Sequence, residues 1–107
     1  EALEHAGLWE AIQPHLVLGE NVAQAAQFAV SGSTDGGIIA HSLALAPDLA
    51  TIGRSALIPS DWHAPLLQRM VLMPDAGPVA EACYAYVQSP EGIRILSAHG
   101  FSMPQGQ

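Results

Sequence analysis

The chain has 107 residues, with 10 acidic side chains against 3 basic ones and a formal net charge of −7. Its length suits one small domain or part of a larger one, and a hydrophobic content of 50% argues against disorder. Nucleic acid is excluded as a partner, because Arg54, Arg69 and Arg94 are scattered and the chain contains no lysine. Every apolar run is shorter than the roughly 20 residues of a membrane span.

The first residues are typical of a helix that is already under way. Leu3, Leu8 and Ile12 share a helical stripe, and Pro14 ends the helix predicted over residues 1–13. No initiator Met, no cap and no charged-then-apolar leader precede it. We therefore expect a piece of a longer protein, from which any export signal has been removed or in which it was never present.

A short strand and a well-capped helix are predicted next. Residues 15–19 form an apolar run that ends in Gly, which is typical of a brief buried strand. Asn21 is a preferred N-cap, Gln24 stands three positions later as in a capping box, and Gly32 ends the helix. The helix has a narrow face of small residues, so we expect it to approach a sheet closely. That face consists of Val22, Ala25, Ala26 and Ala29.

The middle of the chain alternates short elements. Residues 38–41 predict a second strand, residues 42–47 a helical turn and residues 49–53 a further strand. Residues 54–65 contain two prolines and are typical of an irregular connection. Residues 67–73 are the longest strand candidate.

Two helices complete the chain. Gly77 and Pro78 begin one that runs to about residue 88, and Ser89 caps a second that Gly100 ends.

The chain has one cysteine, Cys83, which leaves no internal disulfide and no cysteine-based zinc site. Cys83 lies on an apolar helical face and is expected to be buried. Strands that alternate with helices indicate an α/β architecture with mainly parallel pairing.

No catalytic residue and no side-chain metal ligand is assigned from the sequence. The histidines show no metal-binding i, i+4 pair, and neither a nucleophile elbow nor a phosphate-cradling loop is present. The histidines are His5, His15, His41, His63 and His99. Two alternatives to a binding protein stay open: a metal-assisted enzyme that uses His41, His63 and an acidic residue, and a purely structural or interaction fragment.

The start of the helix after Gly19 is the feature best suited to binding. A helix N-terminus leaves backbone N–H groups without intrahelical partners and carries about half a positive charge. If Asn21 caps the amides near Ala23 and Gln24, the first-turn amide of Val22 is free to face an anion. Gly19 lets a ligand come near the backbone.

Several segments resemble the periplasmic molybdate-binding proteins of ABC importers. The resemblance is carried by Gly7 to Phe28, with Gly-Glu-Asn-Val-Ala-Gln at residues 19–24 as its most specific block, then by Ser31-Gly32 and by Gly-Ile-Ile-Ala-His-Ser at residues 37–42. Pro-Ser-Asp-Trp-His-Ala-Pro-Leu-Leu-Gln at residues 59–68 is similar to another segment of that family, and residues 89–101 resemble its closing helix more loosely.

The resemblance implies a partial type II periplasmic-binding-protein-like fold, a three-layer αβα arrangement with mainly parallel strands. On this view the chain is the C-terminal half of a two-lobed receptor. Residues 1–55 would be the C-terminal part of the second, insert lobe, and residues 56–66 the segment that crosses between the lobes. Residues 67–107 would be a strand and two helices that return to the first lobe.

The resemblance also implies a ligand and partners. Molybdate or tungstate would be the ligand, held by neutral donors without a cofactor, with the amide of Val22 as one donor and Asn21 shaping the helix start. Ala40 stands where some relatives carry a tyrosine ligand, and its side chain has no hydroxyl to donate. The implied partner is the membrane permease of an ABC importer, in the periplasm. The fragment is expected to self-associate or to pair with the missing N-terminal half, since it would expose apolar surface.

Overall fold

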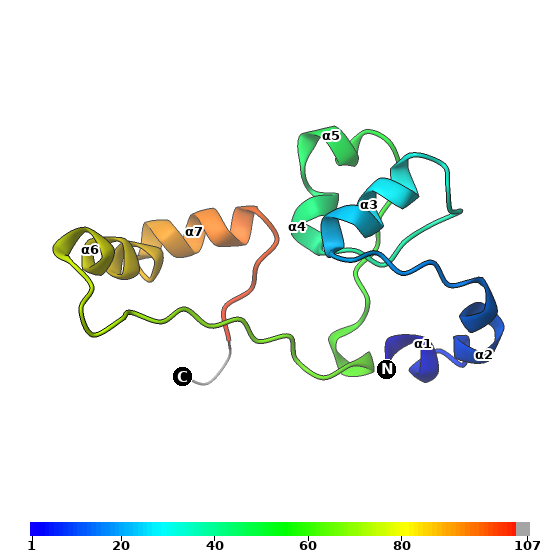
Figure 1. The fold of residues 1–107 in the computed structure, drawn as a ribbon, viewed down its shortest axis with the longest axis horizontal. Helices are drawn as coiled ribbons and strands as arrows, with labels where there is room; N and C mark the ends of the chain where they lie inside the picture. The colour runs from blue at the N-terminus through cyan, green and yellow to red at the C-terminus, as the bar shows by residue number, and fades with distance from the viewer. Residues whose placement is uncertain (105–107) are drawn as a thin grey trace. The chain divides into compact units, whose positions relative to one another are not determined.

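The structure is a computed structural model that describes residues 1–104, and its chain divides into two compact units. The first unit comprises residues 1–65, and the second begins at Leu66. All regular secondary structure among residues 1–104 is helical (Figure 1).

The predicted three-layer αβα fold with mainly parallel strands is therefore wrong for the described residues. Residues 16–19, 36–40 and 66–73 run as irregular chain, and the strand predicted at residues 49–53 is replaced by helix α5, Pro47–Ala50, and a turn. An apolar run indicates burial, whereas a strand also needs a neighbouring backbone with which to exchange hydrogen bonds. No such ladder forms within residues 1–104.

The first thirteen residues are not one helix, because Gly7 interrupts them. Gly7 adopts a φ of 70°, in the left-handed region that glycine enters without steric cost. Helix α1, Ala2–His5, ends before it, and helix α2, Trp9–Ile12, begins after it. A 3₁₀ turn, η1, follows at Gln13–His15 and contains Pro14.

Helix α3, Val22–Val30, is the longest helix of the first unit and follows the prediction closely. Ala26 on its small face is 3% exposed and is the one buried hydrophobic residue in the described part of the chain. A β-carbon added at Gly19 would lie 2.8 Å from Ala25 N, and one added at Gly37 would lie 3.2 Å from the Ala29 β-carbon. The expected close approach is thus present, although irregular segments take the place of a sheet.

Three short elements complete the first unit. Helix α4, His41–Ala44, corresponds to the predicted helical turn and contacts α5. The proline-containing connection is irregular as predicted, except for a 3₁₀ turn, η2, at Ser60–Trp62.

The second unit is a pair of packed helices, α6, Pro78–Val87, and α7, Pro90–Ala98, and both were predicted. The hydroxyl of Ser89 accepts a hydrogen bond from Gly92 N at 3.1 Å and donates one to the Tyr86 carbonyl at 2.6 Å. Gly100, with a φ of 88°, follows the end of α7. Cys83 is exposed, so its predicted burial is wrong.

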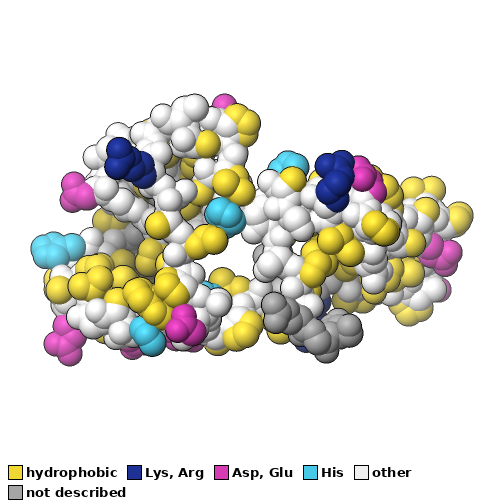
Figure 2. Space-filling model, turned by 180° about the vertical axis from the view of Figure 1, so that it is seen from behind, with side chains coloured by type: hydrophobic (Ala, Val, Ile, Leu, Met, Phe, Trp, Pro, Cys, Tyr) yellow, Lys and Arg dark blue, Asp and Glu magenta, His cyan; other side chains and the backbone are white. Residues whose placement is uncertain are grey.

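Many large apolar side chains lie at the surface, where Figure 2 shows them in yellow. Leu18 is 79% exposed in the first unit, and Leu66 and Val71 are 88% and 78% exposed in the second. The described helices include none long and apolar enough to cross a membrane.

Candidate functional site

The N-terminus of α3 is held in shape by two side chains. Asn21, the N-cap, has extended backbone angles, with φ −153° and ψ 172°, and its Oδ1 accepts a hydrogen bond from Gln24 N at 2.9 Å. The Gln24 side chain turns back, and its Oε1 accepts from Glu20 N at 2.6 Å. The predicted cap is confirmed, with the return bond one residue earlier than in an ordinary capping box.

This capping leaves two backbone donors at the helix start. The Ala25 amide donates to the Asn21 carbonyl at 3.1 Å, as the first helical hydrogen bond. The Val22 and Ala23 amides have no hydrogen-bond partner in the part of the chain that the structure describes. Val22 is 55% exposed. Unpartnered amides at the positive end of a helix dipole can donate to an anion.

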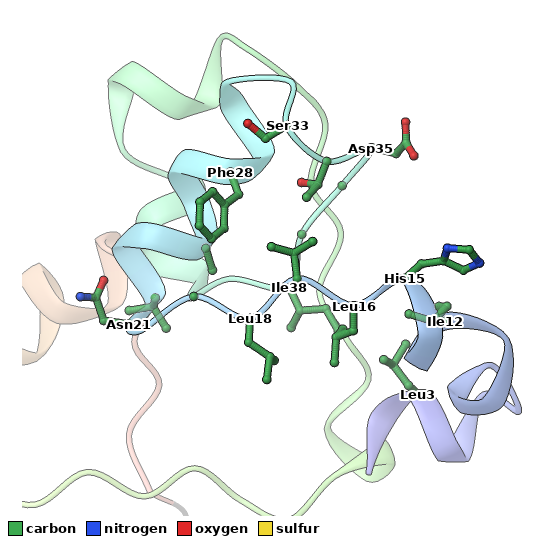
Figure 3. Close-up of a pocket in the computed structure, with 17 residues that line it drawn as sticks. Leu3, Ile12, His15, Leu16, Leu18, Asn21, Phe28, Ser33, Asp35 and Ile38 are labelled. Carbon is green, nitrogen blue, oxygen red and sulfur yellow. The ribbon is translucent and has the colours of Figure 1, made fainter.

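A broad open groove lies along the same end of α3 (Figure 3). It has a volume of about 940 Å³. Ile38 lies beside the irregular segment that carries Leu16 and Leu18, while Phe28 extends from α3 and Asn21 marks the helix start. The groove is therefore mainly apolar, with polar groups at its ends.

The charges around the groove are negative or neutral. The described residues that line it include Asp35 but neither lysine nor arginine, and Glu20 precedes the cap. An anion bound here would have to be held by neutral N–H and hydroxyl donors, which act over short distances.

Sequence reasoning did not single out the hydroxyl residues after α3. Ser31 and Ser33 place their hydroxyl oxygens 2.9 Å apart, and Ser33 and Thr34 line the groove. The Thr34 Oγ1 atom is buried and has no hydrogen-bond partner within residues 1–104. No donor role was assigned from the sequence to the hydroxyls of Ser31, Ser33 and Thr34, although three hydroxyl residues within four positions were a usable signal.

The five histidines lie in separate environments. His5 stacks on Trp62, with ring centroids 5.1 Å apart, and His15 lines the groove. His63 Nδ1–H donates to the Ala64 carbonyl, and His99 Nδ1–H to the Ile95 carbonyl, each at 2.8 Å. His41 begins α4, directly after Ala40. Residues 1–104 contain no group of three or more His, Cys, Asp or Glu side chains arranged to hold a metal ion.

Comparison with known families identifies the class of protein to which the chain belongs. The family model described as "bacterial extracellular solute-binding protein" matches residues 1–102. The chain belongs to this solute-binding protein family. The expectation that the chain is part of a binding protein is thereby confirmed at the level of the family.

Individual relatives within the solute-binding proteins agree with the motif resemblance. The molybdate-binding protein ModA of Rhodobacter capsulatus is 28% identical over 103 residues, covering 94% of this chain and 40% of the relative. ModA of Azotobacter vinelandii is 30% identical over 105 residues, covering 96% and 42%. YvgL of Bacillus subtilis (strain 168), described as a candidate ABC transporter substrate-binding lipoprotein, is 27% identical over 104 residues, covering 95% and 39%.

This solute-binding chain spans about two fifths of the length of those curated relatives. A separate comparison with solved structures found no match.

Proposed function

We propose that this chain is part of a receptor for molybdate or tungstate, in which the Val22 amide donates to an oxygen of the anion. The Val22 N–H at the start of a well-capped helix, which has no partner among residues 1–104, is the observation that carries the proposal. Asn21 acts mainly by fixing the helix start. Two relatives whose names describe molybdate binding support the choice of ligand.

The net charge of the chain agrees with a site made of neutral donors. At −7 the chain repels a dianion at long range, and salt screens that repulsion beyond about 8–10 Å. Hydrogen bonds to a charged group contribute about 1.5–3 kcal/mol each, so several amides and hydroxyls can outweigh the remaining repulsion. No catalytic residue and no cofactor takes part.

The proposed receptor has two lobes and a membrane partner. Residues 1–55 belong to an insert lobe, residues 56–66 cross between lobes, and residues 67–107 return to the other lobe. The receptor delivers its anion in the periplasm to the membrane permease of an ABC importer. The exposed apolar side chains at Leu18, Leu66 and Val71 support either self-association or pairing with an N-terminal half.

Replacing Val22 with proline tests the proposed donor with little other change. Proline lacks an N–H, and it is favoured at the first position of a helix. The extended backbone of Asn21 suits a residue that precedes proline. Helices α6 and α7 already begin with proline. Val22→Ala, which keeps the N–H, is the matched control.

The measurement is a titration of the ¹⁵N-labelled 107-residue chain with molybdate, followed by amide NMR. We expect saturable shifts of the Val22 and Ala23 amide resonances, retained at the Ala23 amide in Val22→Ala. Val22→Pro should weaken molybdate binding about 10- to 100-fold, because a charged hydrogen bond is lost. Equal affinity of the two variants, or an unmoved Val22 resonance, would refute the proposal. Circular dichroism verifies that both variants remain helical.

A further inference from the structure

Residues far apart in the sequence meet at the edge of the first unit. The His5 ring, at the end of α1, stacks on the indole of Trp62 in η2, with centroids 5.1 Å apart and ring planes at 22°. In Figure 1 the start of the chain, in blue, lies beside this green turn. Stacked aromatic pairs contribute to stability beyond their buried area.

A second contact joins the same two segments. The Ala64 amide donates to Glu1 Oε2 at 2.6 Å, between residues 63 positions apart in the sequence. The Ala64 carbonyl accepts from the Nδ1–H of His63 at 2.8 Å. Both backbone polar groups of Ala64 are therefore engaged by side chains, one of them a carboxylate.

The chain changes character immediately after these contacts. Pro65 has no N–H to donate, and it disfavours helical backbone angles at the preceding Ala64. Leu66 is 88% exposed and Leu67 is 57% exposed. The first unit ends at Pro65. Residues 60–64 are thus held by side chains of α1 and its cap, whereas Leu66 and Leu67 are largely in solvent.

We propose that Glu1, His5, Trp62 and Ala64 form a clasp that fixes residues 60–64 to α1. The clasp makes these residues move with the first unit. Bending of the chain that leads into the second unit is therefore confined to residues after Ala64. The two contacts reinforce each other: the stacked rings hold η2 in place, and the Glu1 carboxylate fixes the backbone two residues later. This inference does not depend on which solute the protein binds.

Hydrogen exchange of the Ala64 amide measures the clasp directly. In the full 107-residue chain, we expect this amide to exchange more slowly than an unstructured alanine amide. Glu1→Ala should speed its exchange about 10- to 100-fold, because the carboxylate acceptor is lost. His5→Ala should speed it about two- to tenfold through loss of the stack, while His5→Phe retains an aromatic ring and should preserve most of the protection. His15→Ala, at a histidine outside the clasp, should leave the Ala64 rate unchanged.

A second readout is independent of the Glu1 contact. In a Trp9→Phe background, Trp62 is the one remaining tryptophan, and ¹⁵N relaxation of its indole N–H reports its motion on the nanosecond scale. His5→Ala should increase that motion, and His5→Phe should restore it. The proposal is overturned if the Ala64 amide exchanges at the unstructured rate in the unmodified chain. It is equally overturned if His5→Ala changes neither readout while circular dichroism shows an intact fold.

Discussion

Asn21 and Gln24 cap helix α3 in opposite directions. The Asn21 side chain accepts from the Gln24 amide at 2.9 Å, and the Gln24 side chain accepts from the Glu20 amide at 2.6 Å. Each residue therefore orders the other, and the pair fixes the backbone on both sides of Val22. Because these bonds use the amides of Glu20 and Gln24, those of Val22 and Ala23 are left for another acceptor.

Substitution of Asn21 should separate helix stability from anion binding. Asn21→Ala removes the cap and is expected to lower the free energy of unfolding by about 1 kcal/mol. Asn21→Asp keeps a capping oxygen and should preserve stability, but its carboxylate adds a negative charge beside the Val22 amide and should weaken molybdate binding. Urea unfolding followed by circular dichroism, together with molybdate titration, distinguishes the two effects. Equal binding by Asn21→Asp and the unmodified chain would contradict the proposed site.

Gly92 should tolerate a larger side chain poorly. A β-carbon at this position would lie 2.6 Å from the Val87 carbonyl oxygen and would also overlap the Tyr86 carbonyl oxygen. Both are backbone atoms, so relief requires α6 and α7 to separate. Gly92→Ala is expected to lower the free energy of unfolding by about 1–3 kcal/mol. Gly53→Ala, where no atom lies within 4 Å of the added carbon, is the control. A thermal melt in which Gly92→Ala matches Gly53→Ala would show that the helices adjust freely.

A site made of donors should discriminate among tetrahedral anions by their protons. Phosphate near neutral pH carries a hydroxyl, which would face an N–H donor without an acceptor. Sulfate and molybdate carry no such proton at that pH. We expect molybdate to bind about tenfold or more tightly than phosphate, with sulfate also favoured over phosphate in a parallel titration. Comparable affinities for phosphate and molybdate at neutral pH would argue against a donor-only site.

The Glu91–Arg94 pair should contribute weakly to the stability of α7, in a manner that depends on pH. Arg94 donates from Nε and Nη2 to the two Glu91 oxygens at 3.0 and 2.6 Å, which lowers the pKa of Glu91 below its ordinary value of 4.5. A carboxyl with a lower pKa in the folded chain stabilises it above the unfolded value. The contribution should therefore be present above about pH 4.5 and should disappear as the pH falls through the folded-state pKa.

Because both side chains of this pair are exposed, the effect should be small and sensitive to salt. Arg94→Ala and Glu91→Gln should give similar small decreases in melting temperature at pH 7 and low salt. Both decreases should vanish in 1 M salt or well below pH 4.5. A decrease that persists in high salt would point to packing of the Arg94 stem in place of the ion pair.

The starts of α3, α6 and α7 were well predicted because their signals are local. Asn21 with Gln24, Pro78 after Gly77, and Ser89 before Pro90 each act within a few residues of backbone. The same locality explains the Val22 prediction: once Asn21 caps Gln24, the free amides follow from helix geometry. The groove beside it was not predictable, since Thr34 and Ile38 reach it only through the path of the chain after α3.

The strands were mispredicted because their signal depends on distant partners. Residues 67–73 have the composition of a buried strand, yet pairing requires a second backbone that composition does not specify. The strand predicted at residues 49–53 is absent for a local reason, since Pro47 occupies the first turn of α5 and favours a helix start. Burial of Cys83 depended likewise on an element that would cover α6.

The exposed run from Leu66 to Met73 also affects the tendency of the chain to aggregate in vitro. Its eight residues carry one charge, at Arg69, and no proline, and such segments are prone to cross-β stacking when concentrated. Expression yield and shelf life should therefore be limited by this segment. Substitution of a charged residue for Val71, which is 78% exposed, should slow aggregation without loss of helix content.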